Sequence, residues 1–130
     1  MRALDTNTLI YFFKGQGQVV EHLLQHPPQE IAIPTVVLYE LEVGINKSSS
    51  PDKRRKQLHE LISLTHLLAF DHKAAGIAAQ IRSKLEKDGS PIGSYDILIA
   101  ATAMSNDAIL VSHNVKEFSK VEGLLLEDWY

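Results

Sequence analysis

Short apolar segments alternate with longer stretches of helical spacing along the whole sequence, and this alternation constrains the fold more than any other feature. The first two short segments are residues 2–4 and 31–33, and helical periodicity follows each of them. Strands that alternate with helices pair in parallel, because the helix carries the chain back across the sheet. The sequence therefore predicts an α/β fold in three layers (α/β/α), with helices on both faces of a central parallel sheet.

Caps and helix breakers predict where the remaining elements begin and end. Pro34 suits the first position of a helix, and Ser50-Pro51 restarts one after a break. Asp71 and Ser94 are expected to cap two further helices. Strands are predicted at residues 2–4, 31–33, 67–70, 108–112 and 124–126, and helices at 7–14, 19–25, 34–46, from 51 past 62, from 72 to 88, and at 95–105. The helix after Asp71 is expected to turn Ala75, Ala78, Ala79, Ile81 and Leu85 inward.

Length and composition narrow the class of protein. A chain of 130 residues is expected to form a single domain over residues 1–130. It contains no cysteine, which leaves no disulfide or thiolate metal site and fits the cytoplasm. The early apolar run at residues 9–13 is too short for a signal peptide or a membrane span, so we expect a soluble protein. The formal charge of −3 does not indicate a nucleic-acid partner, so evidence for one must come from particular residues.

Polar residues interrupt the apolar segments at four places. Asp5 follows the first predicted strand and Asn114 follows a later one, and ligand-binding groups gather at the carboxyl ends of parallel strands. Glu40 falls on the apolar side of the helix at 34–46, and Asp96 falls in the first turn of a buried helix, where the helix dipole favours an anion. Taken singly, these residues have ordinary explanations: a helix cap, a half-exposed helix residue, a dipole-complementing residue and a turn residue.

Taken together, the three acids would repel one another at the edge of an apolar core. An unpaired buried carboxylate is costly unless a cation compensates it. Arg2, the nearest cation in sequence, begins the strand that Asp5 follows and is expected at the opposite end of the sheet. Mg²⁺ and Mn²⁺ bind carboxylate and water oxygens. The sequence therefore favours a divalent metal site at Asp5, Glu40 and Asp96.

Four stretches of the chain, in order, resemble a PIN domain. They are residues 5–7 (DTN), 40–44 (ELEVG), 91–101 (PIGSYDILIAA) and 110–118 (LVSHNVKEF). More closely, the chain resembles, from residue 2 to residue 129, a VapC-type toxin ribonuclease of a type II toxin–antitoxin system. The resemblance implies that Asp5, Glu40 and Asp96 bind Mg²⁺ (or Mn²⁺), that Asn114 takes the fourth catalytic position, and that Asn7 and Ser112 support them.

Two positions depart from the commonest pattern of the family. Many PIN domains have Asp where this chain has Asn114, and related toxins often have Thr where it has Ser112. An amide offers a carbonyl oxygen but no negative charge, so one or two metal ions remain possible.

The resemblance implies a metal-dependent endoribonuclease that hydrolyses RNA phosphodiester bonds with a metal-activated water, leaving 5′-phosphate and 3′-hydroxyl ends. It also implies a homodimer and a cognate VapB-like antitoxin whose tail covers the active site. Residues 9–13 hold more apolar surface than one helix face buries, so part of this segment either meets that tail or belongs to the core. The basic groups at residues 53–56, and at Arg82, Lys84 and Lys87, either steer the RNA backbone or form solvated helix faces.

Two other classes of protein stay open. A receiver domain is also a small α/β fold with acids at strand ends, but the phosphoacceptor Asp and the late Lys that it needs are not placed in this sequence. A non-catalytic PIN-like module would keep the fold and only bind RNA or a protein. Metal-dependent cleavage of RNA separates this module from an enzyme.

Overall fold

The centre of the fold is one five-stranded parallel sheet. The computed structural model describes residues 1–130 and places the strands in the order β3-β2-β1-β4-β5. All four strand pairings are parallel, as the alternation of strands and helices predicts. The strands are β1 (Arg2–Leu4), β2 (Ile31–Pro34), β3 (His66–Leu68), β4 (Ile109–Val111) and β5 (Leu126–Glu127).

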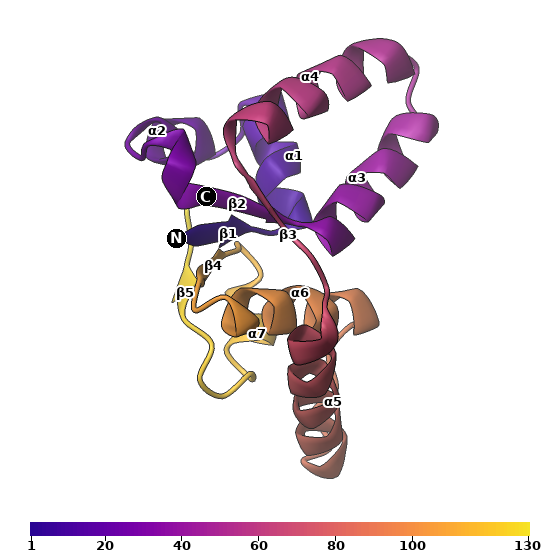
Figure 1. Cartoon of the computed structure of the whole chain (residues 1–130), viewed down its shortest axis with the longest axis vertical. Coiled ribbons are helices and arrows are strands. Elements are labelled where there is room, and N and C mark those ends of the chain that lie inside the picture. The colour runs from indigo at the N-terminus through magenta and orange to yellow at the C-terminus, as the bar shows by residue number, and fades with distance from the viewer.

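Helices cover both faces of this sheet, which confirms the predicted three-layer arrangement. In Figure 1, α1 to α4 lie on one side of the sheet and α5 to α7 on the other. The helices are α1 (Thr6–Lys14), α2 (Val19–Leu24), α3 (Thr35–Asn46), α4 (Pro51–Leu64), α5 (His72–Lys87), α6 (Ser94–Ser105) and α7 (Val115–Phe118), with a 3₁₀ turn at Pro28–Glu30.

The buried core holds the ends of the strands and the first turn of α6 in position. Ala3 and Leu4 of the central strand β1 and Ile33 of its neighbour β2 are fully buried. α6 packs between the sheet and α5, and its buried residues include several alanines, whose small side chains permit close helix packing. The first turn of α6, which carries Asp96, is therefore held against the sheet. None of the helices combines the length and apolar composition that crossing a bilayer requires.

Several predicted boundaries are wrong by one or a few residues. Pro34 is the last residue of β2 and the N-cap of α3, with ψ of 141°, rather than the first helical residue. Ser94 does not cap α6, because it is already helical and Gly93 is the N-cap. Asp71 does cap α5, where its side chain accepts a hydrogen bond of 3.0 Å from the Ala74 N–H.

The inward face of α5 also differs from the prediction. Ala78, Ile81 and Leu85 are buried as expected, but Ala75 and Ala79 are exposed. The helix is rotated so that Ala74 lies inward instead, because residues 74, 78, 81 and 85 form one continuous stripe at helical spacing.

Candidate active site

The carboxyl ends of β1 and β4 are joined directly, which brings the residues that follow them together. Leu4 pairs with Val111 in the sheet register. The Asp5 N–H and the Thr8 hydroxyl both donate to the Val111 carbonyl, each at 3.1 Å. Asp5, the first residue after β1, therefore lies beside Ser112, the first residue after β4.

Asp5 is a helix cap and a buried acid at the same time. Its Oδ1 accepts a hydrogen bond of 2.9 Å from the Thr8 N–H, which caps α1, and only 5% of the residue is exposed. Burial raises the pKa of Asp5, hydrogen bonds from Ser112 and Thr8 oppose that rise, and the charge of Asp128 adds to it. A helix cap can be exposed to solvent, whereas this carboxylate is buried. The fold therefore places it where its negative charge is costly.

Glu40 and Asp96 reach the same region from two helices. The Thr6 hydroxyl donates to Glu40 Oε1 at 2.7 Å, which ties α3 to the start of α1. Asp96 lies in the first turn of α6. Burial, followed by the charges of Asp5, Glu40 and Glu117 in that order, raises the pKa of Asp96 to about 6. These four acids therefore share one site at the carboxyl edge of the sheet.

Glu117 is an acid of this site that the sequence pattern does not predict. It lies in α7, the four-residue helix that follows Asn114, which is likewise absent from the predicted elements. Lys120 Nζ lies 3.4 Å from Glu117 Oε2, so part of this acid's charge is already compensated. The signal that could have found it is the Asn-x-x-Glu spacing from Asn114 to Glu117, which is typical of a helix N-terminus.

The residues predicted to support the acids have different surroundings. Ser112 is fully buried, opposes the rise in the pKa of Asp5 and accepts the Asn114 N–H at 2.9 Å through its hydroxyl oxygen. Asn114 is the N-cap of α7, but its exposed side chain makes no capping hydrogen bond. Asn7 is exposed on α1 and its side chain makes no hydrogen bond, so the structure does not join it to the acids. The catalytic role of Asn114 and the supporting role of Asn7 stay predictions.

The donor set of this site fits a hard divalent cation. All four acids offer carboxylate oxygens, which Mg²⁺ and Mn²⁺ prefer. No three of the acidic or histidine side chains are close enough to chelate an ion in this arrangement. Burial first, and then the charges of the other acids, raise the pKa of Asp96, and a bound cation would offset both costs of ionising it. Chelation of one ion by three of the acids would therefore require their side chains to move.

Other charged residues face away from the acids or are paired. Arg2 binds Glu127 at 2.9 Å, away from Asp5, as its place at the start of β1 predicts. Glu42 turns toward α4, where it pairs with Arg55 at 3.2 Å. On α5, Arg82 pairs with Glu86 and Lys84 with Asp88, so two of the three basic residues considered there as either RNA contacts or a solvated face have intramolecular partners.

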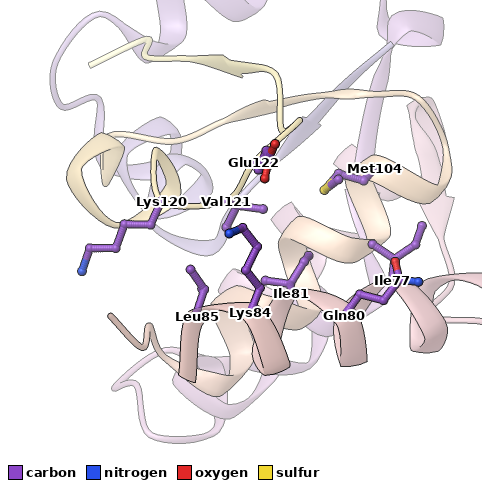
Figure 2. A pocket seen from close by; sticks show the side chains of 9 residues that line it. All are labelled: Ile77, Gln80, Ile81, Lys84, Leu85, Met104, Lys120, Val121 and Glu122. Atoms are coloured by element: carbon purple, nitrogen blue, oxygen red, sulfur yellow. The ribbon is translucent and has the colours of Figure 1, made fainter. Parts of the chain in front are cut away.

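A separate pocket of about 180 Å³ lies between α5, the end of α6 and the segment after α7. Figure 2 shows its nine lining side chains, with the amino group of Lys120 directed outward. None of the four clustered acids lines this pocket. It is therefore distinct from the acid site, although Lys120 connects the two through its contact with Glu117.

A parallel sheet between two layers of helices, with acids gathered at its carboxyl edge, agrees with the class of PIN domains. The family model described as PIN domain matches residues 2–124 of the chain. The tRNA(fMet)-specific endonuclease VapC of Salmonella typhimurium is 33% identical over 126 residues, which cover 97% of this chain and 96% of that protein. The corresponding protein of Shigella flexneri is 35% identical over the same length.

Solved structures agree with this assignment. The structure of DNA-bound VapBC from Salmonella typhimurium matches with a TM-score of 0.92 at 32% identity, covering 99% of this chain and 98% of that chain. VapBC2 from Rickettsia felis, bound to a DNA fragment from their promoter, matches with a TM-score of 0.91 at 32% identity and the same coverage. The chain belongs to the VapC ribonucleases of the PIN domain family.

The two roles of Asp5 can be separated by substitution. Asp5→Asn keeps an oxygen that accepts from the Thr8 N–H, so its free energy of unfolding in EDTA should equal or exceed that of the wild type. Asp5→Ala removes the cap and should cost about 1 kcal/mol. Urea denaturation in EDTA measures both. If Asp5→Asn were as destabilising as Asp5→Ala, burial of the Asp5 carboxylate charge would not be costly in the folded wild type.

Proposed function

We propose that this chain is a metal-dependent endoribonuclease that acts as the toxin of a toxin–antitoxin pair. The observation that carries the proposal is the gathering of Asp5, Glu40, Asp96 and Glu117 at one edge of the sheet in a VapC ribonuclease. The names of the Salmonella and Shigella relatives make a transfer RNA the first substrate to test.

In this proposal Asp5, Glu40 and Asp96 bind Mg²⁺ or Mn²⁺, with Glu117 as a further acid. When bound, the ion lowers the pKa of a water molecule and stabilises charge on the phosphoryl group. The chain's own residues orient the acids: Thr6 holds Glu40, and Thr8 and Ser112 hold Asp5. The exposed Asn114 side chain is free to contact the substrate. Two of the four acids, Asp5 and Glu40, are thus held by hydrogen bonds before the RNA arrives.

Cleavage by purified protein tests this proposal directly. Transfer RNA should be cut in Mg²⁺ or Mn²⁺ and left intact in EDTA, because every proposed ligand is a hard oxygen donor. Glu40→Gln protein purified in the same way should be inactive, which excludes a contaminating ribonuclease. Cleavage that persists in EDTA would contradict the metal mechanism. RNA binding without cleavage would instead support a non-catalytic PIN-like module.

A groove beside Glu40 supports the proposal of an antitoxin partner. It has a volume of about 330 Å³ and lies between α1, α3 and α4, with Ile10 and Phe13 of the predicted segment in its wall. Gln57 also lines it, and the Gln57 Oε1 is buried without a hydrogen-bond partner. An apolar antitoxin segment would fill the groove, and an N–H donor on it would satisfy this acceptor once the Gln57 side chain turns toward the groove. Expression of the chain should arrest growth, and coexpression of the neighbouring gene should relieve the arrest.

We further propose a cytoplasmic homodimer. RNA is available to a nuclease in the cytoplasm, and the exposed Ala75 and Ala79 leave part of α5 with small side chains on which a second helix could pack. Light scattering of the purified protein measures its mass in solution and decides between monomer and dimer.

A further inference from the structure

Three aromatic rings from distant parts of the chain form a cluster beside the acid site. The rings of His113 and Tyr130 stack with their centroids 4.3 Å apart and their planes at 21°. Tyr11 of α1 meets both edge-on, with centroids 4.8 Å from Tyr130 and 6.1 Å from His113. We call these three residues the aromatic platform.

The chain around the platform holds its rings in place. The Gln18 N–H donates to the Tyr130 carbonyl at 2.7 Å, and the Tyr130 N–H donates to Asp128 Oδ1 at 2.9 Å. His113 Nδ1 lies 3.0 Å from the other oxygen of Asp128. Gly17 has a φ of 63°, and a Cβ there would lie 2.6 Å from the Tyr130 carbonyl oxygen, so only glycine fits. The platform is therefore organised before any ligand binds.

The position of the platform links it to the acids. His113 lies between Ser112, which follows the end of β4 beside Asp5, and Asn114, the N-cap of α7. The charge of Asp128, which bonds to the His113 ring and to the Tyr130 backbone, acts on Asp5. Even so, 47% of the His113 side chain and 46% of Tyr130 remain exposed. Two stacked and anchored rings are thus left open to solvent at the edge of the acid site.

We propose that the aromatic platform stacks an unpaired nucleobase of the RNA next to the bond that is cleaved. This inference rests on the proposed ribonuclease function. Proteins recognise single-stranded RNA by stacking its splayed bases on aromatic side chains, and stacking accepts any base because each has a π face. The platform suits a base better than a phosphate, because Asp128 places a carboxylate beside it. Rings that are already fixed lose little conformational entropy when a base binds.

Steady-state kinetics on a short unpaired RNA that the wild type cuts in Mn²⁺ test the platform. Tyr130→Leu should raise KM by about five- to a hundredfold, the range expected for loss of one stacked base. It should change kcat much less, because the acids stay in place. Tyr130→Phe keeps the ring and should retain the wild-type KM. His113→Ala should also raise KM, because it removes the ring that stacks on Tyr130. His66→Ala, which removes an exposed histidine at the amino end of β3, is its control and should leave KM unchanged.

Abasic substrates identify the stacked base. We would use a series of RNAs that each lack a single base, at successive positions around the cut. One RNA of the series should show a raised KM with the wild type but not with Tyr130→Leu. A 2-aminopurine at that position should lose fluorescence when the wild type binds, a readout that does not depend on how well Tyr130→Leu folds.

Three results would overturn the inference while leaving the ribonuclease function intact: an unchanged KM for a folded Tyr130→Leu protein, no sensitive abasic position, or unquenched 2-aminopurine. Each of these results would mean that the three rings only hold residues 128–130 in place. Absence of any cleavage by the wild type would overturn the proposed function and the platform together.

Discussion

Replacement of Asp96 by Asn should abolish RNA cleavage while leaving the metal-free protein at least as stable as the wild type. Burial and the charges of Asp5, Glu40 and Glu117 all disfavour the ionised form of Asp96 in the folded protein. Removal of that charge relieves repulsion when no cation is present. It also removes a proposed metal ligand, so the activity that depends on the ion should be lost.

Thermal melts in EDTA and in Mn²⁺ measure the two effects separately. The wild type should melt at a higher temperature in Mn²⁺, because a ligand that binds only the folded state stabilises it. Asp96→Asn should lose most of that rise and should melt at the wild-type temperature or above in EDTA. A full Mn²⁺-induced rise in the Asp96→Asn protein would remove this residue from the metal site.

Glu60→Gln is a matched control for these melts. Glu60 is exposed on α4 and forms no ion pair, so its substitution changes the net charge by the same amount outside the acid site. It should leave both cleavage and the Mn²⁺-induced rise unchanged. Glu42 lies two residues from Glu40 and would be another possible control. It is less suitable, because its side chain pairs with Arg55 and His59.

The layers of the fold could be predicted because periodicity and apolar composition carry the information locally. The strands 2–4 and 31–33 are short apolar runs that need only a helix on each side to be recognised. Their exact ends depend on partners elsewhere in the chain. The apolar pattern predicts the last strand at 124–126, but the strand is Leu126–Glu127, because it pairs with Leu110 and Val111 of β4. No local pattern specifies that register.

In the candidate site, too, some features follow from local sequence and others depend on distant parts of the chain. Asp5, Glu40 and Asp96 could be predicted because each interrupts an apolar segment at a strand end or on a helix face. The Asn-x-x-Glu spacing could have placed Glu117 at the start of a helix, but its proximity to Asp96 depends on where α7 lies relative to α6, which no local pattern specifies. Side-chain preference assigns the cap of α6 to Ser94, whereas the extended backbone of Gly93 begins the helix without a side-chain bond.

The dependence of stability on pH in EDTA should show the cost of the charge on Asp96. Its pKa is about 6 in the folded protein and 3.8 ordinarily, so the folded state binds this proton more tightly than the unfolded state. Stability should therefore fall as the pH rises from about 4 to about 6, and then level off. The difference of about two pH units corresponds to about 3 kcal/mol, which the partial exposure of Asp96 reduces to about 1 kcal/mol.

Comparison of the wild type with Asp96→Asn isolates this contribution from the other acids. Glu127, whose pKa is lowered by its hydrogen bond with Arg2, acts in the opposite sense, because its stabilisation is lost as the pH falls below its ordinary value of 4.5. Since Glu127 is present in both proteins, its effect cancels in the difference. Urea denaturation at pH 4, 5, 6 and 7 should give a difference in the free energy of unfolding that grows in favour of Asp96→Asn up to about pH 6. Parallel profiles for the two proteins would mean that Asp96 is not held among the other acids, and the metal site would then lose its physical basis.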